Sequence, residues 1–225
     1  MSGSPSTTVV VPVKPSGVAL RRLAGMLDAR TRRELQAAML EDVLGACAAA
    51  SGLIEVLVVT ADPEAGARAA AQGARIIPDH DPPRGMNAAV EIGLAEAARS
   101  GAEAALVLTA DLPLASAGEI AAALAAAGPP GSVLLVPSRD GTGTNAMLLR
   151  PPTAMRPALG PDSRARHLAR ALRAGLAALT RELPGLALDI DTPADLLALM
   201  ASGVPCATRT AFERASARAG AGSAL

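Results

Sequence analysis

Acidic residues lie at the ends of two segments that the sequence predicts as strands. Asp189 and Asp191 are two positions apart, so on a strand both carboxylates leave the same face, with their α-carbons about 6–7 Å apart. Asp111 ends another apolar run and is expected at the same edge of the sheet. Unpaired carboxylates repel one another, and Mg²⁺ prefers carboxylate oxygens together with substrate phosphates, so the three aspartates predict a divalent metal site. The alternative is that Asp191 caps the helix starting at Pro193 and Asp111 caps a turn.

A loop rich in glycine and threonine, Gly-Thr-Gly-Thr-Asn-Ala at 141–146, formally matches the Gly-x-Gly-x-x-Ala dinucleotide fingerprint. That fingerprint must open a helix directly after the first strand, whereas here the apolar run 147–149 follows. The sequence therefore excludes a Rossmann dehydrogenase. It favours a loop whose amides and hydroxyls approach an anionic ligand, with a plain hairpin turn as the alternative.

Two predicted helices begin in segments that suit anion binding. Arg84-Gly85-Met86-Asn87 opens one helix, and Gly160-Pro161-Asp162-Ser163 opens another, which carries several arginines and His167. Free amides and the positive end of the helix dipole suit a phosphate or a carboxylate. The alternative is that Asp162 or Ser163 only caps its helix and that the arginines form a solvated face. His167 alone is more often structural than catalytic.

Lys14 follows the first predicted strand and is the only lysine among 21 basic residues. The chain otherwise uses arginine, as expected of a GC-rich genome. Lys14 therefore suggests a position where a compact ammonium is needed and a planar guanidinium does not fit.

Short apolar runs alternate with segments of helical period, which is typical of a mostly parallel α/β sheet flanked by helices. The predicted strands span residues 8–13, 56–60, 74–78, 105–110, 133–137, 146–150 and 186–190. The predicted helices span residues 31–49, 63–72, 86–99, 116–127, 163–178 and 193–200. In such sheets ligands bind outside the carboxyl ends of the strands, where Lys14, Asp111 and the late aspartates are expected.

Composition narrows the classes of function. The chain has 225 residues, 21 basic against 21 acidic groups, and a single aromatic residue, Phe212. These values argue against a basic nucleic-acid or membrane surface and against base stacking. With no membrane span, no signal peptide and no cysteine cluster, we expect a cytoplasmic protein in which Cys47 and Cys206 are ordinary thiols. One catalytic domain is expected over residues 1–202, followed by a partly disordered tail over residues 203–225.

These motifs together resemble the CofC/FbiD family, the guanylyltransferases of coenzyme F-420 (deazaflavin) biosynthesis. The resemblance runs in the same order over about residues 8–200. It is carried by Val-Pro-Val-Lys at 11–14, Met-Leu-Glu-Asp-Val-Leu at 39–44, Gly-Met-Asn-Ala-Ala at 85–89, Asp-Leu-Pro at 111–113, Gly-Thr-Gly-Thr-Asn at 141–145, Gly-Pro-Asp-Ser at 160–163 with His167, and Asp-Ile-Asp-Thr-Pro at 189–193.

The resemblance implies a nucleotidyltransferase fold like that of glycosyltransferase A and the molybdenum cofactor guanylyltransferases. It also implies transfer of GMP from GTP to a three-carbon phospho-acid, namely phosphoenolpyruvate, 3-phosphoglycerate or 2-phospho-L-lactate, with release of pyrophosphate. GTP and the phospho-acid are the expected partners, and a homodimer is left open. The implied roles are binding of two Mg²⁺ ions by Asp111, Asp189 and Asp191, phospho-acid binding by Thr144, Gly160 and Ser163, and nucleotide binding by Lys14, Gly85 and Asn87. Lys14 and the three aspartates are the expected catalytic residues. Arg22 is a second candidate, after Lys14, for binding the nucleotide by offsetting charge on the departing pyrophosphate.

One position departs from the family pattern. The family has a lysine where this chain has Leu20, so either Arg21 supplies the lost charge or triphosphate binding is weakened. The alternatives that follow are another metal-dependent nucleotidyl or glycosyl transferase and a non-catalytic GTP-binding protein. A plain interaction module does not explain three aspartates at strand ends.

Overall fold

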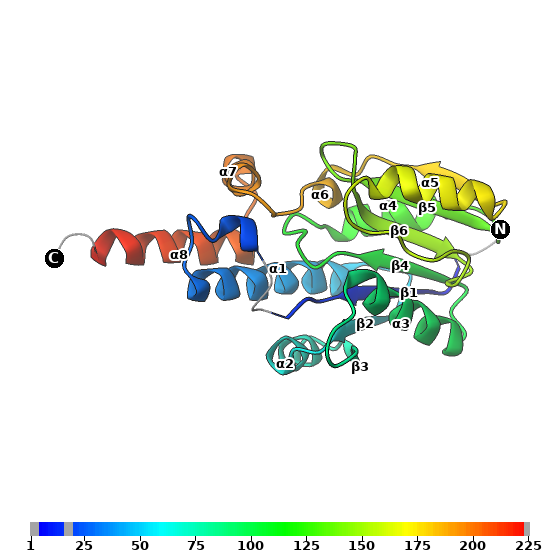
Figure 1. Ribbon diagram of the computed structural model, residues 1–225, viewed down its shortest axis with the longest axis horizontal. Coiled ribbons are helices and arrows are strands. Elements are labelled where there is room, and N and C mark those ends of the chain that lie inside the picture. Colours follow the sequence, from blue (N-terminus) through cyan, green and yellow to red (C-terminus); the bar gives the residue numbers. More distant parts are fainter. Residues whose placement is uncertain (1–4, 16–19, 223–225) are drawn as a thin grey trace.

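The computed structural model describes residues 5–15 and 20–222, and this part of the chain forms one seven-stranded sheet with helices on both faces (Figure 1). The strand order is β3-β2-β1-β4-β6-β5-β7. The strands are β1 (Thr7–Pro12), β2 (Leu53–Thr60), β3 (Arg75–Pro78), β4 (Ala104–Leu108), β5 (Ser132–Pro137), β6 (Thr144–Arg150) and β7 (Ala177–Thr180).

The sheet is mostly parallel, as predicted, because only β6 runs antiparallel to its neighbours β4 and β5. Strand β1 is buried along its whole length and pairs with β2 and β4, with Val9 opposite both Val56 and Leu106. A continuous apolar run buried on both faces is what a central parallel strand requires. The carboxyl ends of β1 and β4 therefore meet at one edge and bring Lys14 and Asp111 toward each other.

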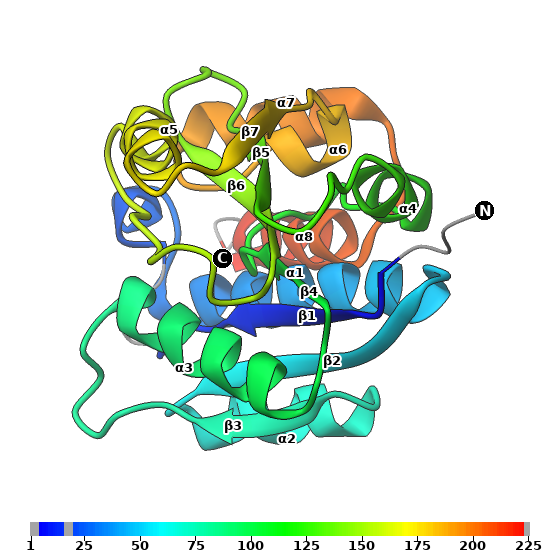
Figure 2. The ribbon, with the colours of Figure 1, turned by 90° about the vertical axis from the view of Figure 1, so that its right-hand side faces the viewer.

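Helices cover the sheet in two layers (Figure 2). Helices α1 (Ala29–Ala49), α2 (Pro63–Ala71) and α4 (Ala117–Ala125) pack on one face, and α3 (Met86–Arg99) and α5 (Ser163–Arg173) pack on the other. Gly93 of α3 lies directly on β1: a Cβ at this position would come within 2.3 Å of Val10. Close packing of α3 therefore requires glycine there, and it fixes the start of α3 beside the sheet edge.

A third apolar cluster lies beyond that edge and joins segments far apart in the sequence. It includes Leu20, Leu23 of the short 3₁₀ helix η1 (Arg21–Leu23), Leu35 of α1, and the pair Leu188 and Ile190. The two late aspartates alternate with Leu188 and Ile190 along the chain. Burial of these apolar neighbours therefore orients the aspartates away from the cluster.

The prediction of a last strand over residues 186–190 is wrong. Pro184 starts the short helix α6 (Pro184–Ala187), and residues 188–191 continue without a regular element. The seventh strand is β7 (Ala177–Thr180). Its first two residues fall at the end of the segment predicted as helix 163–178, and its last two lie beyond that segment. Gly175, in the left-handed region at φ 65°, follows the end of α5 and lets the chain turn into β7.

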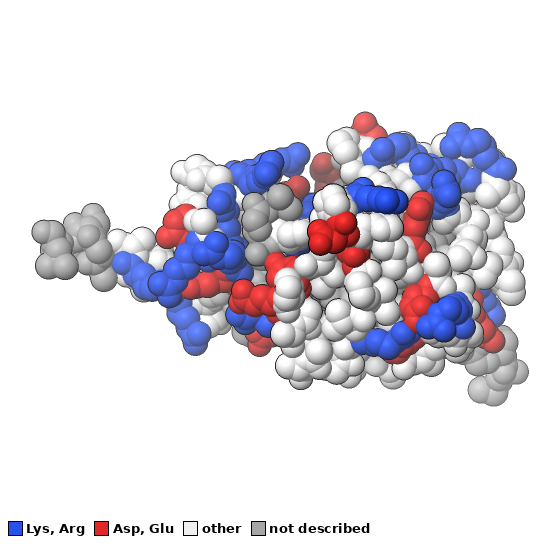
Figure 3. Space-filling view, turned by 60° about the horizontal axis from the view of Figure 1, so that its bottom comes forward, with Lys and Arg blue, Asp and Glu red and all other residues white. Residues whose placement is uncertain are grey.

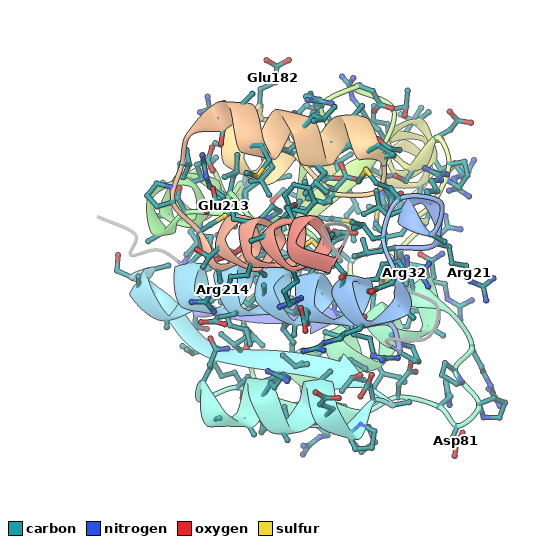
Figure 4. All side chains as sticks on the ribbon, turned by 90° about the vertical axis from the view of Figure 1, so that its left-hand side faces the viewer. Arg21, Arg32, Asp81, Glu182, Glu213 and Arg214 are labelled. Carbon is teal, nitrogen blue, oxygen red and sulfur yellow. The ribbon has the colours of Figure 1, made fainter. Side chains whose placement is uncertain are left out.

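The segment after Ser202, expected as a partly disordered tail, contains helix α8 (Ala207–Gly222) after α7 (Pro193–Ser202). Figures 1 and 4 show α8 running alongside α1. The carboxylate of Asp42 on α1 accepts hydrogen bonds from the amides of Ala207 and Thr208, at 2.7 and 3.0 Å, and from the Thr208 hydroxyl at 2.6 Å. A side chain from α1 thus supplies the acceptors that the first turn of α8 needs.

We expect Asp42→Ala to destabilise the protein by about 1–2 kcal/mol, the usual cost of losing a helix cap. Glu41→Ala, which removes the exposed acid next to it, serves as the matched control. Urea unfolding of the three proteins measures the difference. Equal midpoints for Asp42→Ala and Glu41→Ala would contradict the capping role.

Charges of both signs are interspersed on the face shown in Figure 3, in keeping with the balanced composition. Within residues 5–15 and 20–222, no helix is long and apolar enough to cross a membrane.

Candidate active site

A cleft of about 670 Å³ opens at the carboxyl edge of the sheet. Nine of the ten residues singled out from the sequence line it, and Gly85 is the exception: it precedes α3 as its N-cap, at φ 94°. The nine are Lys14, Arg22, Asn87, Asp111, Thr144, Gly160, Ser163, Asp189 and Asp191.

The two aspartate segments are joined by backbone pairing. The amide of Ile190 donates to the carbonyl oxygen of Asp111 at 3.0 Å. Asn145, on β6, donates through Nδ2 to the carbonyl of Ala187 at 3.0 Å and to Oδ1 of Asp189 at 3.2 Å. The segment therefore lies beside the end of β4 although it is not a strand, and Asn145 holds the Asp189 carboxylate in place.

Burial and mutual repulsion disfavour negative charge on these aspartates. The pKa of Asp189 is raised to about 6, first by burial and then by the charges of Asp111 and Asp191, while the hydrogen bond from Asn145 acts in the opposite direction. The pKa of Asp111 is also raised, chiefly by burial, while the Thr109 side chain and then the charge of Lys14 act against the shift. The carboxyl groups of Asp111 and Asp189 thus repel each other when both are ionised, and a bound cation would relieve that repulsion.

The aspartates fit a divalent cation whose remaining ligands would come from the substrate. Oδ1 of Asp111 is buried and has no hydrogen-bond partner in the described part of the chain. Among the described residues no three acidic, histidine or cysteine side chains already form a metal-binding group. Mg²⁺ is commonly held by one or two carboxylates together with substrate phosphates and water, so an incomplete protein ligand set agrees with this ion.

We expect metal-free protein to lose stability, relative to an Asp189→Asn variant, as the pH rises from about 4 to about 7. Between the ordinary pKa of 3.8 and the folded value of about 6, the folded chain binds a proton more readily than the unfolded chain, so the contribution to stability falls as the pH rises. The difference in the free energy of unfolding between the wild type and Asp189→Asn should change by on the order of 2 kcal/mol over this pH range. Urea unfolding with a chelator, near pH 4.5 and pH 7, measures it, and a difference independent of pH would contradict the shift.

The loop from Ser138 to Gly143 is organised around Asp140. Oδ1 of Asp140 accepts hydrogen bonds from the Ser138 hydroxyl at 2.6 Å, the Thr142 amide at 2.9 Å and the Thr142 hydroxyl at 3.0 Å, and these bonds lower its pKa to about 2. The amide of Gly143 donates to Ser138 Oγ at 2.7 Å, and a Cβ there would lie 2.6 Å from that oxygen. The loop joins the antiparallel strands β5 and β6, so it is a hairpin, and it also lines the cleft.

Thr144, Gly160 and Ser163 lie together on the side of the cleft nearest α5. Ser163 is the first residue of α5, and its amide donates to the carbonyl of Gly160 at 3.1 Å. Gly160 has φ 112°, a backbone conformation that residues other than glycine rarely adopt. The loop before it is tied to α3, because Asn87 accepts from the amide of Leu159 at 2.7 Å and donates to its carbonyl at 3.1 Å. Asn87, expected on the nucleotide side, therefore fastens the loop that leads to Gly160.

Three cationic residues line the cleft: Lys14, Arg22 and Arg139. Arg22 Nη1 lies 3.3 Å from Oδ2 of Asp191, and both side chains are exposed. Leu20, which stands where the family has a lysine, is 8% exposed and packs in the third apolar cluster, with φ 52°. Arg21 is not among the residues lining the cleft and extends outward in Figure 4. Arg22, not Arg21, is thus the arginine of this segment that reaches the cleft.

Three polar residues that shape the site were given no role from the sequence. Asn145 holds Asp189, and Arg139 lines the cleft while its side chain donates to Asp195 at 3.0 Å. Asp195 in turn accepts from the amide of Thr192 at 2.8 Å and completes the capping box of α7. The rarity of asparagine was a signal for Asn145. The Thr-x-x-Asp pattern at 192–195 was a local signal for Asp195 as a helix cap. No local pattern predicts its contact with Arg139, which spans 56 positions.

Comparison with known proteins agrees with this geometry. A family model described as "Guanylyl transferase CofC like" matches residues 7–215. The chain is 46% identical over 199 residues to a phosphoenolpyruvate guanylyltransferase of Conexibacter woesei, covering 86% of this chain and 87% of that protein. It is 44% identical over 191 residues to the protein of the same name from Sphaerobacter thermophilus, covering 85% and 91%.

The fold has matches among solved structures. A crystal structure of a nucleotide-diphospho-sugar transferase from Desulfovibrio desulfuricans superposes with a TM-score of 0.73 at 16% identity, over 94% of this chain and 95% of that chain. This likeness confirms the predicted fold class. The family model and the two relatives establish the rest: the chain belongs to the family of CofC-like guanylyl transferases and is a nucleotidyltransferase.

Proposed function

We propose that this protein transfers GMP from GTP to phosphoenolpyruvate and releases pyrophosphate, as a step of coenzyme F-420 biosynthesis in the cytoplasm. One observation carries the proposal: a single cleft joins the three predicted aspartates, Asp111, Asp189 and Asp191, to Lys14 and Arg22 and to the small residues Thr144, Gly160 and Ser163 beside the start of α5. We propose phosphoenolpyruvate, and not 3-phosphoglycerate or 2-phospho-L-lactate, as the acceptor because the two relatives are named phosphoenolpyruvate guanylyltransferases.

We assign metal binding to Asp111, Asp189 and Asp191, with two Mg²⁺ ions as the expected number. When bound, the metal supplies neutralisation of the phosphate charge and polarisation of the α-phosphate. The protein's own contribution is to hold the carboxylates at one edge, through Asn145 and the Ile190 amide.

The reaction needs no general base. An oxygen of the acceptor phosphate, already ionised near neutral pH, forms a bond to the α-phosphorus of GTP, and the bond from that phosphorus to the β-bridging oxygen breaks, so pyrophosphate leaves. The barrier comes from bringing one anion onto another. Lys14 and Arg22 are placed to offset charge on the leaving pyrophosphate. We assign binding of the acceptor to Thr144, Gly160 and Ser163, which lie near the positive end of α5.

The test is Mg²⁺-dependent release of pyrophosphate from GTP, with phosphoenolpyruvate, 3-phosphoglycerate and 2-phospho-L-lactate offered separately and ATP as the control donor. We expect release with GTP and phosphoenolpyruvate. Release with another of the acids would correct the acceptor but keep the reaction. GTP binding without release with any of them would instead favour a protein that kept the fold and lost its activity.

A further inference from the structure

His167 is fully buried between two parts of the acceptor pocket, and both of its ring nitrogens have partners. Its Nε2 accepts a hydrogen bond from the amide of Ala158 at 2.7 Å. Its Nδ1 lies 3.0 Å from Oγ1 of Thr144, a residue that lines the cleft. His167 therefore connects the backbone of the loop before Gly160 to a side chain in contact with the cleft.

The backbone partner fixes the tautomer. An amide can only donate, so Nε2 must present a lone pair, and a neutral imidazole then carries its proton on Nδ1. This assignment rests on the partners of the two nitrogens. Nδ1 consequently donates to Oγ1 of Thr144, and that oxygen acts as the acceptor.

The hydrogen bonds from the Ala158 amide to His167 and from His167 to Thr144 keep the same donors and acceptors near neutral pH. Burial and the charges of Arg170 and Arg166 lower the pKa of His167 to about 4, so the ring stays neutral near physiological pH. The loop that supplies the Ala158 amide is itself held: Arg170 donates to the carbonyls of Arg156, at 3.0 Å, and Pro157, and Asn87 makes its two bonds to Leu159.

The hydroxyl group of Thr144 can therefore donate its own hydrogen to a group other than His167. Oγ1 already accepts a hydrogen bond from Nδ1 of His167, and no acceptor for the hydroxyl's own hydrogen is found within the residues that the structure describes. Since Thr144 is 4% exposed and lines the cleft, an anionic group of the bound acceptor is the partner that remains. We propose that His167 is a positioning residue that fixes the Thr144 hydroxyl as a donor to the phosphate or carboxylate of the acceptor. The proposal rests on the proposed function for the identity of that acceptor.

The tautomer can be tested without substrate. The full-length protein, labelled with ¹⁵N-histidine and carrying His80→Gln so that only His167 reports, is examined by two-dimensional ¹H–¹⁵N NMR at neutral pH. We expect a protonated Nδ1 and an unprotonated Nε2. The opposite tautomer, or a charged ring, would overturn the proposal whether or not the protein turns over phosphoenolpyruvate.

The consequence for binding is tested with a matched pair of variants. His167→Asn keeps a donor near the position of Nδ1, whereas His167→Gln keeps an acceptor near the position of Nε2 and loses the donor to Thr144. For His167→Gln and for Thr144→Val we expect the KM for phosphoenolpyruvate to rise about tenfold or more, as for a lost bond to a charged group, with the KM for GTP unchanged. His167→Asn should stay within about threefold of wild type, and His167→Gln should add nothing in the Thr144→Val background.

Equal effects of His167→Asn and His167→Gln, or a full additional effect in the double variant, would show a merely structural role and refute the proposal. Melting temperatures are recorded so that kinetics are compared with every variant folded. A wild-type protein that releases no pyrophosphate with phosphoenolpyruvate would refute the proposed function, and the NMR result would then still decide the role of His167.

Discussion

Replacing Asp189 with asparagine should lower the turnover number by about a thousandfold, the scale of removing a principal electrostatic element of a transition state. The variant removes one carboxylate from the edge where Asp111 and Asp191 also lie, while the amide keeps the same shape. Because the pKa of Asp189 is raised to about 6 by burial and its neighbours, the neutral amide relieves repulsion in the metal-free protein. We therefore expect the stability at pH 7 to be unchanged or higher.

Steady-state rates at increasing Mg²⁺, with urea unfolding in parallel, measure both effects. Glu182→Gln is the matched control, since it makes the same acid-to-amide change on an exposed side chain that points away from the body in Figure 4. It should leave rate and stability within experimental error. An Asp189→Asn protein with the wild-type rate at saturating Mg²⁺ would rule out the metal assignment.

Replacing Lys14 with alanine should lower the turnover number by about a hundredfold, as for the loss of one fixed charge at developing negative charge. Lys14 lines the cleft, and its charge acts on Asp111. We expect Lys14→Arg to remain at least about tenfold impaired, because a planar guanidinium differs from a compact ammonium in shape and hydration.

Arg21→Ala is the control, and kcat and the KM for GTP are the measurements. Arg21 points outward, so its loss should change neither value more than about twofold, the scale of an exposed surface charge. Full activity of Lys14→Arg would show that charge alone matters. A large loss in Arg21→Ala would show that it reaches the triphosphate in the working protein.

The strand ends were predictable because buried apolar runs and the residues after them are local features. Lys14 and Asp111 follow from such runs, and the first six predicted strands correspond to β1 through β6. The segment with Asp189 and Asp191 was placed at the correct edge for a partly wrong reason: it is held by the Ile190 amide and Asn145 and is not a strand.

The rest depends on contacts that no local pattern records. Helix α8 has little apolar period, and its start is stabilised by Asp42, more than 160 positions earlier. The role of His167 depends on Ala158 and Thr144 coming together around a buried ring. Leu20 stands where the family has a lysine, but it is buried in the same apolar cluster as Leu188 and Ile190. Arg22, two positions later, lies beside Asp191.

In the proposed reaction, the acceptor phosphate attacks the α-phosphorus of GTP in this cleft. This step is tested most directly by ³¹P NMR of a reaction containing the protein, Mg²⁺, GTP and phosphoenolpyruvate. We expect two new, mutually coupled phosphorus signals from the joined phosphates and one inorganic pyrophosphate for each product formed, with neither seen over the same reaction time in the Asp189→Asn variant. GMP accumulating beside unchanged phosphoenolpyruvate, or no reaction in the presence of bound GTP, would contradict it.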